Sequence, residues 1–217
     1  MPAILRLLED TLSADGSLDA ALPAMPRMVF VVHGAATIDG RTFGDGEAWF
    51  GEGPLAMTAG AAGVTCWRFE LAPASSAGGA AGRGVVSREK LAVPLDHLPA
   101  GDLLLRGDSV AFPPGGCAYR HTHQGPGIRC LIEGGIRIDT HGRSTSYGPG
   151  GAWFESGPEP VFAQGADRPT RFIRAMILPR ALIGKSSIAY VDEGDRARPK
   201  SQQYKIYVDA PISRSPA

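Results

Sequence analysis

The hydrophobic positions of the chain form one helical pattern at the amino terminus and a series of short extended patterns after it. Apolar residues recur at helical spacing from Ile4 to Leu12, with Pro2 before them and Gly16 after them. This pattern predicts a helix over residues 3–13. The segments that follow are short and rich in β-branched and aromatic residues, which predicts strands at 28–32, 35–38, 48–50 and 64–71.

Composition strengthens the strand prediction. The 217 residues include 29 Gly and 18 Pro, both above average usage and typical of many turns between short strands. The sequence therefore predicts an all-β protein. Residues 72–84 are mainly Ala, Gly and Ser with little to bury, which is typical of a linker.

An internal repeat divides the chain. Residues 42–54 align with residues 146–158, and seven of the 13 aligned positions are identical, including Trp49 with Trp153. A repeat of this kind indicates a duplicated structural unit. We therefore expect two copies of one β unit, with both tryptophans serving the fold.

Charge and cysteine content exclude several classes of protein. The 22 basic and 22 acidic residues balance, which argues against a nucleic-acid-binding protein. No apolar run approaches the roughly 20 residues of a membrane-spanning helix, and the amino terminus lacks a secretory signal pattern. Three widely spaced cysteines, Cys66, Cys117 and Cys130, do not form a disulfide framework. A cytoplasmic protein is expected.

The second copy contains a histidine pair that the first copy lacks. His121 and His123 lie two residues apart on an extended segment, so both side chains should point to one face. Their nitrogens could then bind one divalent metal ion; the alternative is a pair of partly exposed histidines near a turn. Tyr119 is expected on the same face, where it could donate a hydrogen bond to a bound oxygen or simply pack in the core.

These motifs resemble those of the cupins. The first cupin motif, which runs Gly, HxH, Glu, Gly, is matched by Gly115 or Gly116, His121, His123 and Gly134. The second, which places a Gly before a Pro/Gly turn, is matched by Gly150, Trp153, Phe154, Gly157 and Pro158. The resemblance covers residues 28–73 and 103–180. It implies two jelly-roll barrels in one chain, a bicupin, here preceded by the predicted short helix.

The chain departs from the cupin pattern at two metal ligands. The family glutamate would fall at Gly127, and we align the third histidine with Val161. A third ligand must therefore come from elsewhere, and the candidates are Gln124, Glu155, Cys130 and His141. We favour Gln124 or Glu155. The resemblance leaves the metal open among Fe, Mn, Ni and Zn.

The same alignment predicts the direction of the Arg129 side chain. If Gly127 faces the barrel interior, alternation turns Arg129 inward and Cys130 outward. A buried guanidinium needs an anionic partner. That partner is either a substrate carboxylate or a protein acid such as Glu155 or Asp108.

The predicted organisation has five parts: a helix and lead-in at 1–27, a degenerate cupin unit at 28–73, a linker at 74–102, the unit with HxH at 103–180, and an extension at 181–217. Residues 203–209 alternate as an amphipathic strand. No partner strand is evident in its own repeat, and an open sheet edge must accept it. We expect a homodimer.

The resemblance implies a metal-dependent enzyme of the dioxygenase or isomerase/lyase type. Its substrate would be a small organic molecule, with a carboxylate as one candidate group. His121, His123 and Gln124 would hold the metal. Arg129 would orient the anionic end of the substrate, and Tyr119 or Glu155 would transfer protons. The alternative is a small-ligand-binding or sensing cupin that has lost a full metal centre, since cupins serve many functions.

Overall fold

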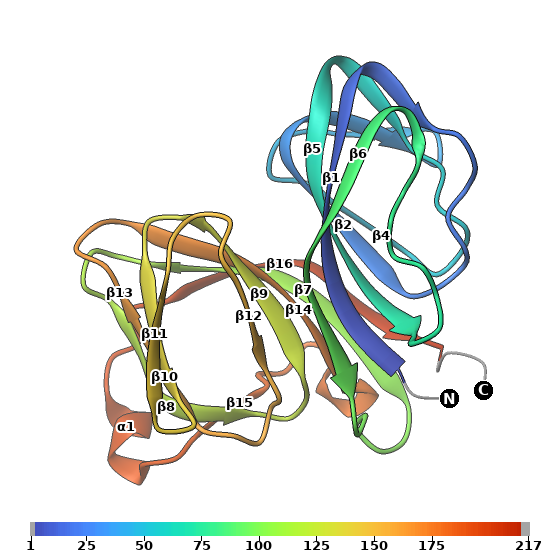
Figure 1. The fold of residues 1–217 in the computed structure, drawn as a ribbon. Coiled ribbons are helices and arrows are strands. Elements are labelled where there is room, and N and C mark those ends of the chain that lie inside the picture. Colours follow the sequence, from blue (N-terminus) through green and yellow to red (C-terminus); the bar gives the residue numbers. More distant parts are fainter. Residues whose placement is uncertain (1–2, 214–217) are drawn as a thin grey trace. The chain divides into compact units, whose positions relative to one another are not determined.

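The computed structural model describes residues 3–213, and nearly all of its regular structure is β-strand (Figure 1). This confirms the all-β prediction. The described residues form two compact units. Unit 1 comprises the residues up to His97 together with 212 and 213, and unit 2 comprises Leu98–Pro211.

Unit 1 contains one six-stranded antiparallel sheet. Its path is β3-β2-β5-β1-β6, and β4 pairs with β2 beside it. The strands are β1 (Ala3–Leu18), β2 (Arg27–Ile38), β3 (Arg41–Phe43), β4 (Ala48–Gly51), β5 (Thr58–Pro73) and β6 (Gly82–Leu95). Its apolar core includes Val29, Trp49 and Cys66.

The predicted amino-terminal helix over residues 3–13 is wrong, because these residues belong to strand β1. Strand β1 lies between β5 and β6, so that Leu5 is paired with both Leu71 and Val93. Leu5, Leu7 and Leu8 are buried on both faces of the sheet. A strand covered on both faces has a nearly continuous apolar run, and periodicity alone cannot distinguish such a run from a buried helix.

Strand β6 lies within the range 74–102, which we expected to be a linker. It forms a long antiparallel ladder with β1, from Ala3 opposite Leu95 to Leu18 opposite Gly82. Only the segment between β5 and β6 keeps the irregular backbone that its Ala, Gly and Ser content predicts.

Unit 2 contains two five-stranded sheets, with the orders β11-β10-β13-β8-β15 and β12-β9-β14-β7-β16. The strands are β7 (Leu103–Phe112), β8 (Cys117–His123), β9 (Gly127–Glu133), β10 (Ile136–Thr140), β11 (Arg143–Tyr147), β12 (Ala152–Glu155), β13 (Val161–Gly165), β14 (Thr170–Pro179), β15 (Ile188–Tyr190) and β16 (Gln203–Ile212). The helices η1 (Arg180–Leu182) and α1 (Glu193–Ala197) are short. No helix in the described part of the chain is long and apolar enough to cross a membrane.

The sequence repeat reappears as a repeated pairing order. Strands β4-β2-β5-β1-β6 of unit 1 follow the same order as β12-β9-β14-β7-β16 of unit 2. Trp49 on β4 is paired with Val29, and Trp153 on β12 is paired with Arg129. Both tryptophans are buried. The ladders of the described residues form open sheets, so two closed barrels are not confirmed.

The carboxyl-terminal strand has a partner in its own unit. Strand β16 extends over Gln203–Ile212 and lies beside β7 at the edge of a unit 2 sheet. The expectation that this strand lacks a partner in its own repeat is therefore wrong. The homodimer stays a prediction, without support from the carboxyl-terminal strand.

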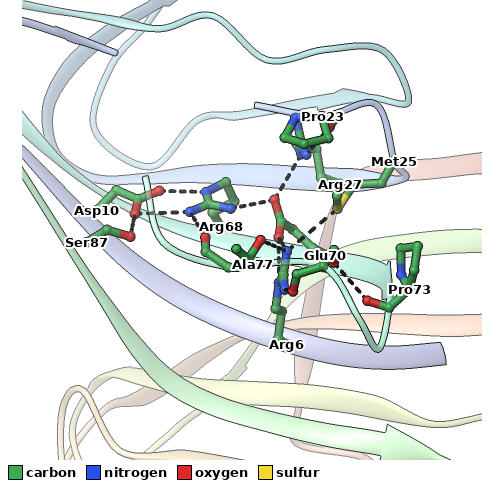
Figure 2. A network of polar contacts seen from close by, with 12 residues as sticks. Arg6, Asp10, Pro23, Met25, Arg27, Arg68, Glu70, Pro73, Ala77 and Ser87 are labelled. Atoms are coloured by element: carbon green, nitrogen blue, oxygen red, sulfur yellow. Dashed lines mark hydrogen bonds and ion pairs between the residues drawn. The ribbon is translucent and has the colours of Figure 1, made fainter. Parts of the chain in front are cut away.

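Five charged side chains lie buried together in the interior of unit 1 (Figure 2). They occupy alternate positions on β1, β2 and β5, on the face that also carries the apolar core. They are Arg6, Asp10, Arg27, Arg68 and Glu70. Three guanidinium groups thus share two carboxylates inside the protein.

Glu70 is the centre of this network. Its Oε2 accepts a hydrogen bond of 2.7 Å from Arg6 Nε, and its Oε1 lies 3.1 Å from Arg27 Nε. Arg68 Nη1 donates to the same Oε1, while Arg68 Nε donates to Asp10 over 2.6 Å. Burial lowers the pKa of Arg27, and Glu70 acts in the opposite direction. Glu70 therefore offsets part of the desolvation cost of three arginines.

Replacing Glu70 should destabilise unit 1 strongly. We expect Glu70→Gln to lower the free energy of unfolding by about 3–5 kcal/mol, because Arg6 and Arg27 have no other acid partner among the described residues. Urea unfolding of the full chain measures the change. The control is Glu89→Gln, which removes an exposed carboxylate of β6 and should change stability by less than about 0.5 kcal/mol. Equal effects of the two substitutions would contradict the role of Glu70.

Candidate metal centre

Strands β8 and β12 bring His121, His123 and Glu155 together in the interior of unit 2. One ligand atom from each residue lies within 4.8 Å of the others. The three residues are only 5%, 4% and 8% exposed. A buried group of two imidazoles and one carboxylate is a chemically suitable set of ligands for a divalent transition metal.

The two histidines point their Nε2 atoms at one another. These atoms are 3.2 Å apart, and the rings are nearly perpendicular. Two nitrogens bound to one ion at about 2.1 Å would also lie roughly 3 Å apart. The predicted common face of His121 and His123 is therefore present, with the spacing that a shared ion needs.

The outer nitrogens of both rings have partners that orient them. His121 Nδ1 lies 2.7 Å from the carbonyl oxygen of Tyr119, which only accepts, so this nitrogen carries the proton. His123 Nδ1 lies 3.4 Å from Ser187 Oγ, whose hydroxyl can donate or accept. Partners of this kind fix the imidazole orientation at metal sites.

Burial keeps both imidazoles neutral. It lowers the pKa of His121, and it lowers the pKa of His123 well below its usual value. For His123 the positive charges of Arg129 and Arg174 act in the same direction. Neutral imidazole is the form that binds metals.

Glu155 is held from both sides. Trp153 Nε1 donates a 2.9 Å hydrogen bond to its Oε1. Its Oε2 lies 2.7 Å from Arg129 Nη2 and 3.5 Å from His123 Nε2. The Arg129 contact is a close ion pair that lacks hydrogen-bond geometry, and among the described residues Oε2 has no hydrogen-bond partner. This oxygen is therefore available to an ion between Glu155 and the histidines.

Gly127 explains why the carboxylate comes from β12. In the ladder of β9 and β12, Gly127 lies directly opposite Glu155. A Cβ atom at Gly127 would lie 2.7 Å from Met176 Cγ and 2.8 Å from the Ala175 carbonyl oxygen. Because neither a glutamate nor an alanine fits there without movement, the neighbouring strand supplies the carboxylate.

Arg129 is 1% exposed and lines the cavity beside the histidines. Burial lowers its pKa to about 10, with Glu155 raising it and Arg174 lowering it further. It therefore remains protonated at neutral pH. Of the two protein acids considered as partners, Glu155 is the one in contact, because Asp108 forms a bidentate pair with Arg174 at 2.7 and 2.9 Å.

The expectation that Tyr119 shares the face of His121 is wrong. The ladder of β8 and β13 shifts register between Val161, opposite His121, and Ala163, opposite Ala118. This bulge inserts an extra residue, so Ala118 lines the cavity and Tyr119 does not. The Tyr119 ring instead lies under Arg198 and Lys200.

Gln124 is not brought to the cluster either. It is exposed in the turn after β8, next to His123 in sequence and absent from the cavity lining. Among the other candidates, Cys130 is buried and paired with Ala152 and Ile173, but it does not line the cavity. His141 lies in an exposed turn near Glu159.

Sequence reasoning missed three residues of the site: Arg174 and Tyr204 line the cavity, and Ser187 contacts His123. The position of Arg174 was predictable in principle, because it lies two residues from Phe172 and from Met176 on one strand and so shares a face with these apolar side chains. The positions of Ser187 and Tyr204 were not, since only the tertiary fold brings Ser187 to His123 and Tyr204 to the cavity.

Comparisons with known proteins agree with this architecture. No family model matches the chain, and no curated protein matches it. Solved structures of oxalate decarboxylase from Bacillus subtilis are similar. One, from a study of its Mn(II) centres, has a TM-score of 0.63 at 12% identity and covers 89% of this chain and 73% of that chain. A further oxalate decarboxylase structure, from a study of proton-coupled electron transfer, has a TM-score of 0.63 at 13% identity, with the same coverage.

The chain has a cupin fold. At this identity the likeness concerns the fold alone, so the chemistry must be argued from the residues of this chain. Its two neutral imidazoles and the available Glu155 Oε2 fit a divalent ion.

A side chain at position 127 should destabilise unit 2. We expect Gly127→Ala to lower the free energy of unfolding by about 1–3 kcal/mol, because the new Cβ atom overlaps a backbone oxygen. The control is Gly148→Ala, since a Cβ atom there meets nothing within 4 Å. Urea unfolding compares the two variants. Equal stability would contradict the proposed reason for the missing glutamate.

Loss of Arg129 should leave the buried Glu155 carboxylate without its counterion. We expect Arg129→Met to destabilise the metal-free protein by about 3–5 kcal/mol, because a buried carboxylate loses its counterion. Excess Mn²⁺ should raise the melting temperature of this variant more than that of the wild type, since the cation replaces the lost charge. Thermal melting with and without Mn²⁺ measures both effects. A variant that melts like the wild type in both conditions would refute this role of the ion pair.

Proposed function

We propose that unit 2 is the catalytic unit of a metal-dependent enzyme that acts on a small organic carboxylate, by dioxygenase or isomerase/lyase chemistry. The observation that carries the proposal is the convergence of two neutral imidazole nitrogens and one carboxylate oxygen within 4.8 Å. The cupin fold supports it, because the similar oxalate decarboxylase has Mn(II) centres.

His121, His123 and Glu155 would hold the ion. Three protein ligands leave coordination positions for water or a substrate oxygen. A bound divalent ion would supply Lewis-acid polarisation of such an oxygen. Mn, Fe, Ni and Zn all accept imidazole and carboxylate ligands.

The residues around the ion suit an anionic substrate. Arg129 and Arg174 both line the inner cavity, and each is paired with one acid. An incoming carboxylate would thus meet two guanidinium groups, of which Arg129 would orient it. Glu155 is the acid in the cavity lining, and in this proposal it would be a ligand of the ion rather than the proton donor that the sequence also allowed.

We further propose that the chain is a bicupin whose unit 1 is structural. Aligning Trp49 with Trp153 in the ladders sets Gly51 at the position of Glu155, and Val29 at that of Arg129. A Cβ atom at Gly51 would lie 2.4 Å from the Trp49 ring, so no carboxylate fits there. Unit 1 fills its interior with the Glu70 network instead.

One observation favours the alternative, a protein that binds a small ligand without turnover. The inner cavity beside the histidines has a volume of about 20 Å³, room for roughly one water molecule. A substrate needs more space, so catalysis requires a side chain at the cavity mouth to move.

Metal binding is the first test. Untagged wild-type protein should bind about one Mn²⁺ per chain, and His121→Ala or Glu155→Gln should weaken binding at least about 100-fold, because each removes a ligand. Isothermal titration calorimetry measures the affinity, and elemental analysis the content. His141→Ala, which removes an exposed histidine, is the control and should bind like the wild type. Unchanged binding by His121→Ala would refute the site.

A turnover assay distinguishes the enzyme from the ligand-binding alternative. The Mn²⁺- and Fe²⁺-loaded proteins are incubated with a panel of small carboxylates while oxygen consumption, carbon dioxide release and product formation are followed. Turnover that His121→Ala abolishes supports the enzyme. Saturable binding without turnover supports the ligand-binding alternative.

A further inference from the structure

A second, larger pocket in unit 2 adjoins the metal cavity. It is open, has a volume of about 280 Å³, and lies between the middle of β7, the segment before β15 and strand β16. Three of its lining residues, Arg174, Ile188 and Tyr204, also line the inner cavity. We call it the outer pocket.

The outer pocket also reaches the metal cluster through Ser187. This residue lines the outer pocket, and its Oγ lies 3.4 Å from His123 Nδ1. A molecule in the outer pocket is therefore separated from the histidines by only one layer of side chains. We infer that the outer pocket binds a small organic anion with an apolar body. This inference rests on the proposed function only for what happens to that ligand at the metal.

The charge of the lining favours an anion. Among the lining residues, Arg174 is neutralised by Asp108, and Arg106 is neutralised by Asp209 at 2.9 Å. The two lysines differ, because no described acid forms an ion pair with Lys185 or Lys200.

The two lysines contribute positive charge in different ways. Lys185 is exposed and lines the pocket. The ammonium of Lys200 donates to three backbone carbonyls, those of Asp195, of Arg198 over 2.6 Å and of Arg196 over 3.2 Å. These carbonyls use its three N–H groups but neutralise no charge. Its ammonium lies 4.4 Å from the centre of the Tyr190 ring. The pocket thus holds two positive charges that are not balanced by protein carboxylates.

The other residues that line the outer pocket favour a ligand with an apolar body. Tyr204 and Ile206 are 45% and 54% exposed, which is unusual for large hydrophobic side chains, and both face this pocket. Ile188 and Tyr190 complete the apolar lining. Pockets for drug-sized ligands span roughly 300–1,000 Å³. A single aromatic ring or short branched chain with one carboxylate therefore suits this volume.

The positions of the lining residues within the outer pocket also suggest how the ligand is oriented. The lysines lie in the outer pocket only, whereas Arg174, Ile188 and Tyr204 lie at its inner end. The anionic group would bind Lys185, with the charge of Lys200 adding long-range attraction. The apolar body would then contact Ile188 and Tyr204, whose movement would open the way to the metal.

Benzoate is the probe, with benzylamine as its cationic counterpart and acetate as the anion without a ring. Isothermal titration calorimetry on the full chain should show saturable benzoate binding, weaker acetate binding and no benzylamine binding. Lys185→Glu should weaken benzoate binding about tenfold through charge reversal. Lys205→Glu makes the same change on an exposed part of β16 outside the pocket and should leave the affinity unchanged.

The result that overturns the inference is equal binding of benzoate and benzylamine, equal weakening by the two lysine variants, or no benzoate binding. Titrations of His121→Ala distinguish this inference from the proposed function. Benzoate binding retained by His121→Ala, with Mn²⁺ binding lost, supports the outer pocket and the metal site separately. Mn²⁺ binding without benzoate binding would leave the metal centre standing and refute the outer pocket.

Discussion

Charge neutralisation inside a low-dielectric interior is the constraint on which both units depend. Each unit buries arginines on the inward face of its central strand, Arg68 on β5 and Arg174 on β14, and each guanidinium is paired with an acid from a neighbouring strand. An unpaired charge there would cost more than one ion pair stabilises. The registers of the central ladders are therefore set by charge pairing as well as by apolar packing, because a shift of one residue would turn these charges outward.

The sequence predicted what depends on local alternation, and it could not predict what depends on long-range pairing. The strand class, the repeat, the common face of His121 and His123 and the inward direction of Arg129 follow from period-two geometry. The amino-terminal strand has the apolar pattern of a buried helix because its side chains are buried on both faces of the sheet. Tyr119 was misplaced by a bulge, which has no signature in a single sequence. Gln124 was preferred as a neighbour in sequence, whereas Glu155 becomes a neighbour only when β12 pairs with β9.

Units 1 and 2 share one order of paired strands but have different side chains in their interiors. In unit 1 the Trp49 ring excludes a side chain at Gly51, while Arg27 fills the space at the position of Gly127. In unit 2 these choices are reversed, with a glycine on β9 and a carboxylate on β12. The exchange is concerted, because a carboxylate in one strand requires space in the strand opposite. In the proposed metal site the carboxylate therefore lies on β12, opposite Gly127, while the pairing order of the strands is the same in both units.

The contact between Arg129 and Glu155 bears on the order of events when the protein matures. A domain whose ligands are held together only by the metal, such as a zinc finger, folds only when the metal is bound. Here a guanidinium already balances the buried carboxylate, and the imidazoles are neutral. In the proposed site, unit 2 would therefore fold before it binds an ion. The ion that it takes would then depend on which metals the folded protein meets.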